Sequence, residues 1–220
     1  MIHREDSFYR ISDDLSLTKE ERYRKGCFHK DKRLYEYTFK NDDGKDPVMK
    51  KIRKYAYSLD KNSLGLLLWG NSGNGKTFAA ACIANSRMTE CEPIPVLMTS
   101  FGFIINRIFS EPNKDELIEN IVSYPLLIID DLGAERQSEY TQEIIYNIVD
   151  ARYKTGRPLI VTTNLTLDQI QNPTDLRYVR IYDRLLEMCV PVHFKGISRR
   201  KAISEQNRDI MKALFDEVEQ

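Results

Sequence analysis

The segment from Gly70 to Thr77 constrains the fold of this chain more than any other. It reads Gly-Asn-Ser-Gly-Asn-Gly-Lys-Thr and matches the phosphate-binding loop pattern G-x-x-x-x-G-K-[ST] at every fixed position. The apolar run Leu64 to Trp69 precedes it, and a helical pattern that begins Thr-Phe-Ala-Ala-Ala overlaps its end. A loop of this kind lies between a buried strand and the start of a helix. The segment therefore predicts an α/β domain that binds a nucleotide.

The predicted loop supplies both backbone and side-chain ligands for phosphate. Gly70, Gly73 and Gly75 let the backbone curl so that successive N–H groups face the β-phosphate, and the helix N-terminus adds about half a positive charge. We expect Lys76 to bridge the β- and γ-phosphates, and the hydroxyl of Thr77 to ligate Mg²⁺. The predicted ligands are ATP and Mg²⁺, and the predicted nucleotide-binding residues are Gly70, Asn71, Ser72, Gly73, Asn74, Gly75, Lys76, Thr77 and Phe78.

A second apolar run, Pro125 to Ile129, ends in two carboxylates, Asp130 and Asp131. A buried strand that delivers acids beside a phosphate-binding loop is typical of a Walker B segment. We expect Asp130 to hold Mg²⁺, directly or through water, and Asp131 to act as the base that polarises the attacking water. The alternative is that both acids only cap the next helix.

Short apolar runs alternate with helical patterns from Leu64 onward, which is typical of a parallel sheet with crossover helices. This alternation predicts one doubly wound domain, with ligands outside the carboxyl ends of its strands. The predicted strands are Leu64 to Trp69, Pro95 to Thr99, Leu126 to Ile129, Leu159 to Thr163, and Val190 to Phe194. The predicted helices cover residues 76–88, 101–109, 114–122, 138–154 and 175–188.

The first 60 residues are rich in charge and tyrosine and lack a sustained apolar period. Thr18 to Glu21 has capping-box spacing, so we expect a helix to begin there and Gly26 to end it as the C′ residue. A turn-forming segment at 41–47 then precedes a helical pattern that leads into the core. We expect an N-terminal charged arm over residues 1–45, an ATPase core over 46–205 and a C-terminal helical tail over 206–220.

Charge and cysteine usage exclude several classes of protein. The chain has 33 Lys and Arg residues and 33 Asp and Glu residues, so no whole-molecule field steers it onto nucleic acid. Contact with DNA would need a local patch. No apolar stretch approaches the roughly 20 residues that span a bilayer, so we expect a soluble, cytoplasmic protein. The four cysteines lie far apart, which favours reduced thiols over a zinc site.

Polar residues later in the chain complete the candidate site. Asn164 follows an apolar run and could orient the hydrolytic water or contact the γ-phosphate, although a turn residue or an N-cap is the alternative. Arg177, Arg180 and Arg184 are spaced at three and four residues, so they share one helix face. Such a stripe either faces solvent or supplies positive charge to the nucleotide site of a neighbouring subunit.

These motifs, in this order, resemble the AAA+ ATPases of the DnaC/DnaI helicase-loader type and their IstB-like transposition-helper relatives. The resemblance covers roughly residues 38 to 205. It rests on the segments Leu68 to Thr77, Leu127 to Gly133, Thr162 to Asn164, Ile181 to Leu185, and Gly196 to Arg200.

The resemblance implies an AAA+ core with a five-stranded parallel sheet of strand order 5-1-4-3-2 and helices on both faces. It assigns Asn164 as sensor 1 and Arg184 as the arginine finger that reaches a neighbouring subunit's nucleotide. Arg200 would be sensor 2, with Arg199 as an adjacent rival. Many AAA+ proteins have Glu where this chain has Asp131, and the shorter side chain implies slow, switch-like hydrolysis.

The function implied by the resemblance is an ATP-dependent accessory role in DNA replication, as a helicase loader that assembles into a homo-oligomer when ATP is bound. Its partners would be the replicative DNA helicase and single-stranded DNA. An IstB-like transposition helper, with a transposase as partner, would share every ATPase residue. A small-molecule kinase is a third hypothesis, since the phosphate-binding loop also occurs in nucleoside kinases, but it would not need Arg184 from a neighbouring subunit.

Overall fold

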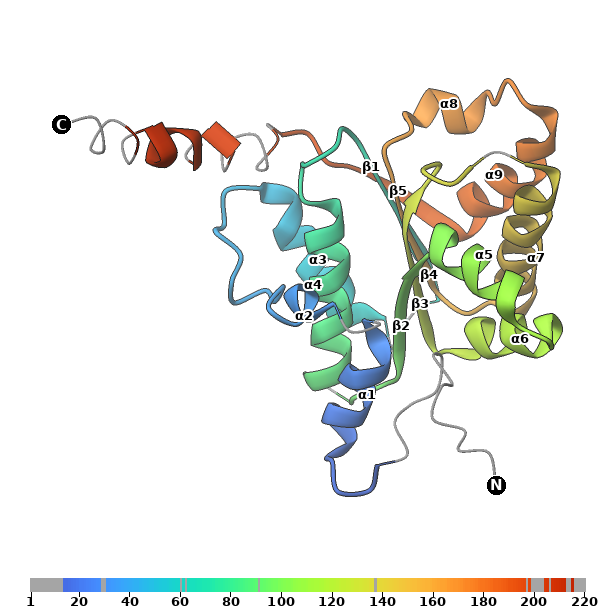
Figure 1. Ribbon diagram of the computed structural model, residues 1–220, viewed down its shortest axis with the longest axis horizontal. Coiled ribbons are helices and arrows are strands. Elements are labelled where there is room, and N and C mark those ends of the chain that lie inside the picture. The colour runs from blue at the N-terminus through green and yellow to red at the C-terminus, as the bar shows by residue number, and fades with distance from the viewer. Residues whose placement is uncertain are drawn as a thin grey trace.

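A five-stranded, fully parallel sheet forms the centre of the computed structural model, with the order β2-β3-β4-β1-β5 (Figure 1). The structure describes residues 14–28, 31–59, 61, 63–90, 92–136, 138–196, 198, 204–205, 207–212 and 215. The strands are β1 (Gly65–Trp69), β2 (Val96–Ser100), β3 (Leu126–Leu132), β4 (Leu159–Thr163) and β5 (Cys189–His193). This order is the predicted order 5-1-4-3-2 written from the opposite edge, so the predicted fold is confirmed.

The inner strands are buried on both faces, which explains their continuous apolar sequences. Leu67, Ile128 and Ile160 are fully buried, and they come from β1, β3 and β4. In β5 the side chain of Val190 is 47% exposed, because this strand forms an edge of the sheet. Each strand predicted from sequence is present, and its ends differ from the prediction by up to three residues.

Helices cover both faces of the sheet and divide the core into two clusters (Figure 1). One face carries α1 (Lys19–Cys27), α2 (Lys32–Tyr35), α3 (Pro47–Ser58) and α4 (Lys76–Thr89). The other carries α5 (Phe101–Ser110), α6 (Lys114–Ser123), α7 (Glu139–Thr155), the short α8 (Leu167–Gln171) and α9 (Leu176–Met188). None of the helices within the described ranges is long and apolar enough to cross a bilayer. Helices α2 and α8 were not predicted, because four or five residues carry too little periodicity.

The start of α1 follows the sequence prediction, but its end does not. Thr18 accepts a hydrogen bond from the backbone N–H of Glu21, and the Glu21 carboxylate accepts one from the N–H of Thr18, which completes the predicted capping box. The expectation that Gly26 is the C′ residue is wrong, because α1 continues to Cys27 and Phe28 is the C-cap. Cys27 and Phe28 are buried in the core, and their burial outweighs the local preference of glycine for a helix end.

The segment before α3 packs directly on the α4 helix. Asn85 of α4 is buried, and its side-chain amide donates hydrogen bonds to the backbone carbonyls of Leu34 at 2.8 Å and Tyr37 at 2.9 Å. The hydroxyl of Tyr35 donates to the carbonyl of Arg24 at 2.9 Å. Residues 14–45 thus share a core with the rest of the chain, while the domain boundaries at 45/46 and 205/206 remain predictions.

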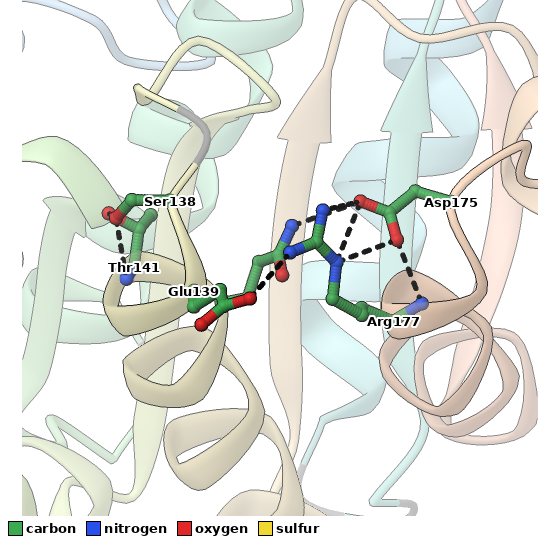
Figure 2. Close-up of polar contacts among 6 residues, drawn as sticks. Ser138, Glu139, Thr141, Asp175 and Arg177 are labelled. Atoms are coloured by element: carbon green, nitrogen blue, oxygen red, sulfur yellow. Dashed lines mark hydrogen bonds and ion pairs between the residues drawn. The ribbon is translucent and has the colours of Figure 1, made fainter.

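Polar contacts also join the N-terminal ends of α7 and α9 (Figure 2). Asp175 caps α9 and accepts hydrogen bonds from the Arg177 guanidinium, which hold the pKa of this carboxyl at about 2. Arg177 also lies 3.5 Å from the carboxylate of Glu139, and Gln142 donates to Asp175 at 3.2 Å. These side chains fix how α7 and α9 lie against each other at one end.

Arg152 of α7 is fully buried, and within the described part of the chain its guanidinium donates to backbone carbonyls alone. Its guanidinium donates to the carbonyls of Val122 at 2.9 Å and Tyr124 at 2.6 Å, and also to the carbonyl of Pro158. Burial lowers the pKa of Arg152 to about 9, which leaves the group charged at neutral pH. Because β3 begins at Leu126 and β4 at Leu159, one side chain ties together the segments that enter both strands.

We predict that Arg152→Ala destabilises the protein by about 3 kcal/mol, because three buried carbonyls lose their donor. Arg157→Ala is the matched control: Arg157 is exposed and donates to the carbonyl of Ser123, so its loss should change the free energy of unfolding by less than about 0.5 kcal/mol. Urea unfolding followed by circular dichroism measures both values. Equal midpoints for Arg152→Ala and wild type would show that the carbonyls find other partners.

Candidate nucleotide-binding site

The loop between β1 and α4 has the backbone shape of an anion site. Gly70 has a backbone φ of +136° and Gly73 one of +84°. Residues other than glycine rarely adopt such values. A Cβ on Gly70 would lie 2.5 Å from the carbonyl oxygen of Phe194, which follows β5. The close approach of this backbone also requires glycine at position 70. Helix α4 begins after Gly75 without a side-chain cap, and the N–H groups of a helix N-terminus are suited to binding phosphate.

The Lys76 ammonium joins the loop to the end of β4. Lys76 is 5% exposed, and its Nζ donates to the carbonyls of Gly70 at 2.7 Å and Asn71 at 2.8 Å. It also donates to the side-chain oxygen of Asn164 at 2.9 Å. An ammonium has three N–H donors, so a phosphate that binds Lys76 must displace or share at least one of these acceptors.

Asn164 therefore lies at the phosphate-binding loop, as the sequence predicted. The N-cap of the next helix, α8, is Thr166, which rules out Asn164 as the residue that caps that helix. Asn164 is exposed, and its side-chain oxygen accepts the hydrogen bond from the Lys76 ammonium.

Thr77, at the start of α4, lies next to Asp130, which belongs to β3. The Thr77 hydroxyl is 3.0 and 3.1 Å from the two carboxylate oxygens of Asp130. Two Mg²⁺ ligands at 2.0–2.1 Å and at right angles lie about 2.9 Å apart, so this separation fits adjacent corners of an octahedron. Both groups are hard oxygen donors, and they fit the magnesium site predicted for them.

Burial raises the pKa of the Asp130 carboxyl above its ordinary value, and the hydrogen bonds from Thr162 and Thr77 offset part of that effect. The Thr162 hydroxyl donates to Asp130 at 2.6 Å and accepts from the backbone N–H of Asp131 at 2.9 Å. Sequence patterns assign Thr162 no role of its own. The signal that could have revealed it is a hydroxyl within the apolar run of β4, the strand that pairs with β3.

Asp131 is exposed and has φ of +58°, the only positive φ among the described residues other than glycine. It lies where the pairing of β3 with β4 is irregular, between Ile129 and Leu132. A bulge of this kind redirects a side chain and is often found beside active sites. The alternative that the two acids cap the next helix is wrong, because Ser138 is the N-cap of α7.

The chain after β5 lies against the loop. The Asn74 side-chain amide donates to the carbonyl of Phe194 at 3.1 Å, and Ser198 packs on Gly73, where a Cβ would be 2.1 Å from the Ser198 hydroxyl. Arg199 and Arg200, the two candidates for sensor 2, lie outside the described residues. The ring of Trp69, at the end of β1, stacks on His193 with centroids 3.7 Å apart.

The other predicted nucleotide-binding residues differ in accessibility. Asn71 and Ser72 are exposed, so their backbone can approach a ligand. Phe78 is half-buried, and its ring centroid lies 5.2 Å from that of Tyr37. Tyr37 thus brings the N-terminal segment beside the first turn of α4.

Arg184 lies on α9 and makes its contacts on α7 and on its own helix. Its guanidinium bonds to the Asp150 carboxylate, the Tyr146 hydroxyl and the carbonyl of Arg180. Among the described residues, none of its hydrogen bonds reaches the phosphate-binding loop of its own subunit.

The family model described as "IstB-like ATP binding protein" matches residues 9–207. The chain belongs to this family. The replicative helicase loader DnaC of Escherichia coli K12 is 27% identical over 146 residues, which cover 65% of this chain and 58% of DnaC. The replicative helicase loader DnaI of Bacillus subtilis is 24% identical over 156 residues, which cover 66% of this chain and 50% of DnaI. The match therefore spans only about half of each relative.

Solved structures agree with the AAA+ fold. A crystal structure of DnaI covers 76% of this chain and 92% of its own length, with a TM-score of 0.63 and 23% identity. A crystal structure of the DnaC helicase loader covers 74% of this chain and 99% of its own, again with a TM-score of 0.63 and 23% identity. The family model thus confirms the predicted family, and the solved structures confirm the predicted fold.

We predict that Asp130→Asn raises the melting temperature of the nucleotide-free protein by about 2–4 °C while it abolishes Mg²⁺-dependent turnover. The physical reason is that the amide still accepts from Thr77 and Thr162 but carries no buried negative charge. Asp131→Asn is the matched control, since Asp131 is exposed and its neutralisation should leave the melting temperature unchanged. Differential scanning calorimetry measures both. A lower melting temperature for Asp130→Asn would contradict the argument.

Proposed function

We propose that this protein is a Mg²⁺-dependent ATPase that hydrolyses ATP slowly and acts as a switch in DNA replication, as a helicase loader. The observation that supports this proposal most is the contact of the Lys76 ammonium with Asn164, beside the Thr77–Asp130 pair. It brings together a phosphate clamp, a candidate γ-phosphate sensor and a candidate magnesium site. Two relatives named replicative helicase loaders match 65% and 66% of this chain.

In the proposed mechanism, the N–H groups at the start of α4 bind the phosphates, and Lys76 turns from Asn164 toward them. Asn164 is then free to orient the attacking water. Asp131, exposed at the bulge in β3, accepts the proton of that water. Thr77 and Asp130 would hold Mg²⁺, which would supply positive charge to neutralise the phosphates.

We further propose that Arg184 is an arginine finger for a neighbouring subunit, and that Arg200 is the sensor 2 residue. A finger supplied in trans can raise the rate by roughly 10³ to 10⁵. The active form would therefore be a homo-oligomer that assembles when ATP is bound. Because the chain has 33 basic and 33 acidic residues, we propose that single-stranded DNA binds only when subunits align their basic patches. We place the protein in the cytoplasm.

We predict that Lys76→Ala abolishes ATP binding, because the phosphates lose their ammonium clamp. Asp131→Asn should bind ATP normally and lose about 10²- to 10⁴-fold in hydrolysis, since only the water-activating base is removed. Binding of a fluorescent ATP analogue and release of phosphate separate the two effects. Normal turnover by Asp131→Asn would exclude Asp131 as the base.

The partner distinguishes the two members of the family that this chain resembles. We predict that the wild-type protein, immobilised with ATP, retains the replicative helicase from an extract of its own cells. Lys76→Ala, which should not bind ATP, is the control. The second candidate is the transposition helper that the sequence resemblance implies, and the family model described as "IstB-like ATP binding protein" keeps it open. Recovery of a transposase and no helicase, identified by mass spectrometry, would decide for that candidate.

A further inference from the structure

The Arg184 guanidinium is held on three sides by side chains of α7. Its Nε donates to an oxygen of Asp150 at 2.8 Å, and its Nη2 donates to the Tyr146 hydroxyl at 3.3 Å. The guanidinium carbon lies 5.0 Å from the ring centroid of Tyr146 and 5.7 Å from that of Tyr153. Only 26% of the Arg184 side chain and 12% of the Asp150 side chain are exposed. Two aromatic faces and a carboxylate thus fix one orientation.

The second oxygen of Asp150 is also occupied, so the carboxylate itself cannot rotate freely. Lys154, one turn later on α7, contacts this oxygen at 2.7 Å. The two oxygens of Asp150 therefore have different partners, and the oxygen that faces Arg184 is defined. A carboxylate fixed in this way fixes the direction of the guanidinium that it binds.

These contacts do not use all of the N–H donors of the Arg184 guanidinium. A guanidinium has five N–H donors. One is used by Asp150, one by Tyr146, and one by the carbonyl of Arg180 at 3.1 Å. With respect to the residues that the structure describes, one N–H remains on each terminal nitrogen, which is the arrangement that binds two oxygens of a phosphate.

The other two arginines on this face of α9, Arg177 and Arg180, lack such a set of contacts with aromatic rings and a buried carboxylate of α7 among the described residues. Arg177 is 55% exposed and bonds to Asp175 and Glu139 at the N-terminal ends of the helices (Figure 2). Arg180 is exposed, and its side chain donates no hydrogen bond to the residues that the structure describes. A long side chain loses rotamer entropy when it is immobilised, so an arginine that is already oriented binds its target at lower cost.

We propose that Asp150 is a positioning residue, which orients the Arg184 guanidinium toward a phosphate bound at the neighbouring subunit. The inference rests on the proposed role of Arg184 as the finger and names the residue on which that role depends. Asp150 touches no nucleotide. It acts by holding Nε, so that the terminal nitrogens face outward.

A positioning role for Asp150 affects turnover but not ATP binding. Asp150→Ala should lower kcat by about 10- to 100-fold, the cost of a reactive group that is misplaced by about 1 Å. The KM for ATP should be unchanged, because the phosphate-binding loop of the same subunit is intact. Asp150→Asn keeps an oxygen that can accept from Nε and should retain most of the activity. Glu139→Ala, which removes the ion pair of Arg177 between the same two helices, should have no effect.

The decisive experiment mixes subunits with complementary defects. Asp131→Asn subunits have an inactive site but an intact finger, whereas Asp150→Ala subunits have an intact site and a displaced finger. A junction in which the first faces the second should therefore regain turnover. Phosphate release is measured for each variant alone and for the mixture, and co-assembly is checked by analytical ultracentrifugation. Arg184→Ala is tested in the same way.

We expect both Asp150→Ala and Arg184→Ala to be slow alone and to recover when mixed with Asp131→Asn. If Arg184→Ala recovers but Asp150→Ala turns over at the wild-type rate alone, the positioning role is wrong and the finger remains. If Asp150→Ala stays slow in a mixture that co-assembles, its defect lies within its own subunit, and the proposal is also wrong. If Arg184→Ala itself has the wild-type rate, the finger proposal fails.

Discussion

The parallel pairing of β1 with β4, and of β4 with β3, is the constraint on which the nucleotide site depends. It places the carboxyl ends of three strands side by side, so residues far apart in sequence come into contact. Lys76 follows β1, Asp130 lies within β3 and Asn164 follows β4. The hydrogen bonds from Lys76 to Asn164 and from Thr162 to Asp130 are possible only with this strand order. The flanking helices and the two core clusters hold that order in place.

The same site holds charges that are only partly compensated without a ligand. Lys76 is nearly buried among oxygens, and burial disfavours the charged form of Asp130. Two opposite charges are thus held close to the place where phosphate and a divalent cation would neutralise them. A site prepared in advance binds with less reorganisation, but the protein carries the free-energy cost of burying these charges before a ligand binds. The binding energy and the stability of the empty protein therefore oppose each other at this site.

Local signals predicted the sheet and most of the site, because a buried parallel strand and a phosphate-binding loop are each continuous in sequence. The end of α1 was missed because it depends on the burial of Cys27 and Phe28 against distant helices. Thr162 was given no role because its hydroxyl acts on a neighbouring strand. Contacts such as Arg184 with Asp150 join residues 34 positions apart, and spacing along one helix carries no information about them. The roles of Asp131, Asn164, Arg184 and Arg200 remain predictions.

Asn85 attaches the N-terminal segment to α4 through backbone carbonyls rather than through side chains. Every residue has a carbonyl, so this attachment does not depend on which amino acids occupy the surface of that segment. Mutations can therefore accumulate on the outer side of residues 34–37 without loosening the joint. A fold with such a joint can change the outer surface of this segment from one sequence to the next while the helix that follows the Gly70 to Thr77 loop keeps its place.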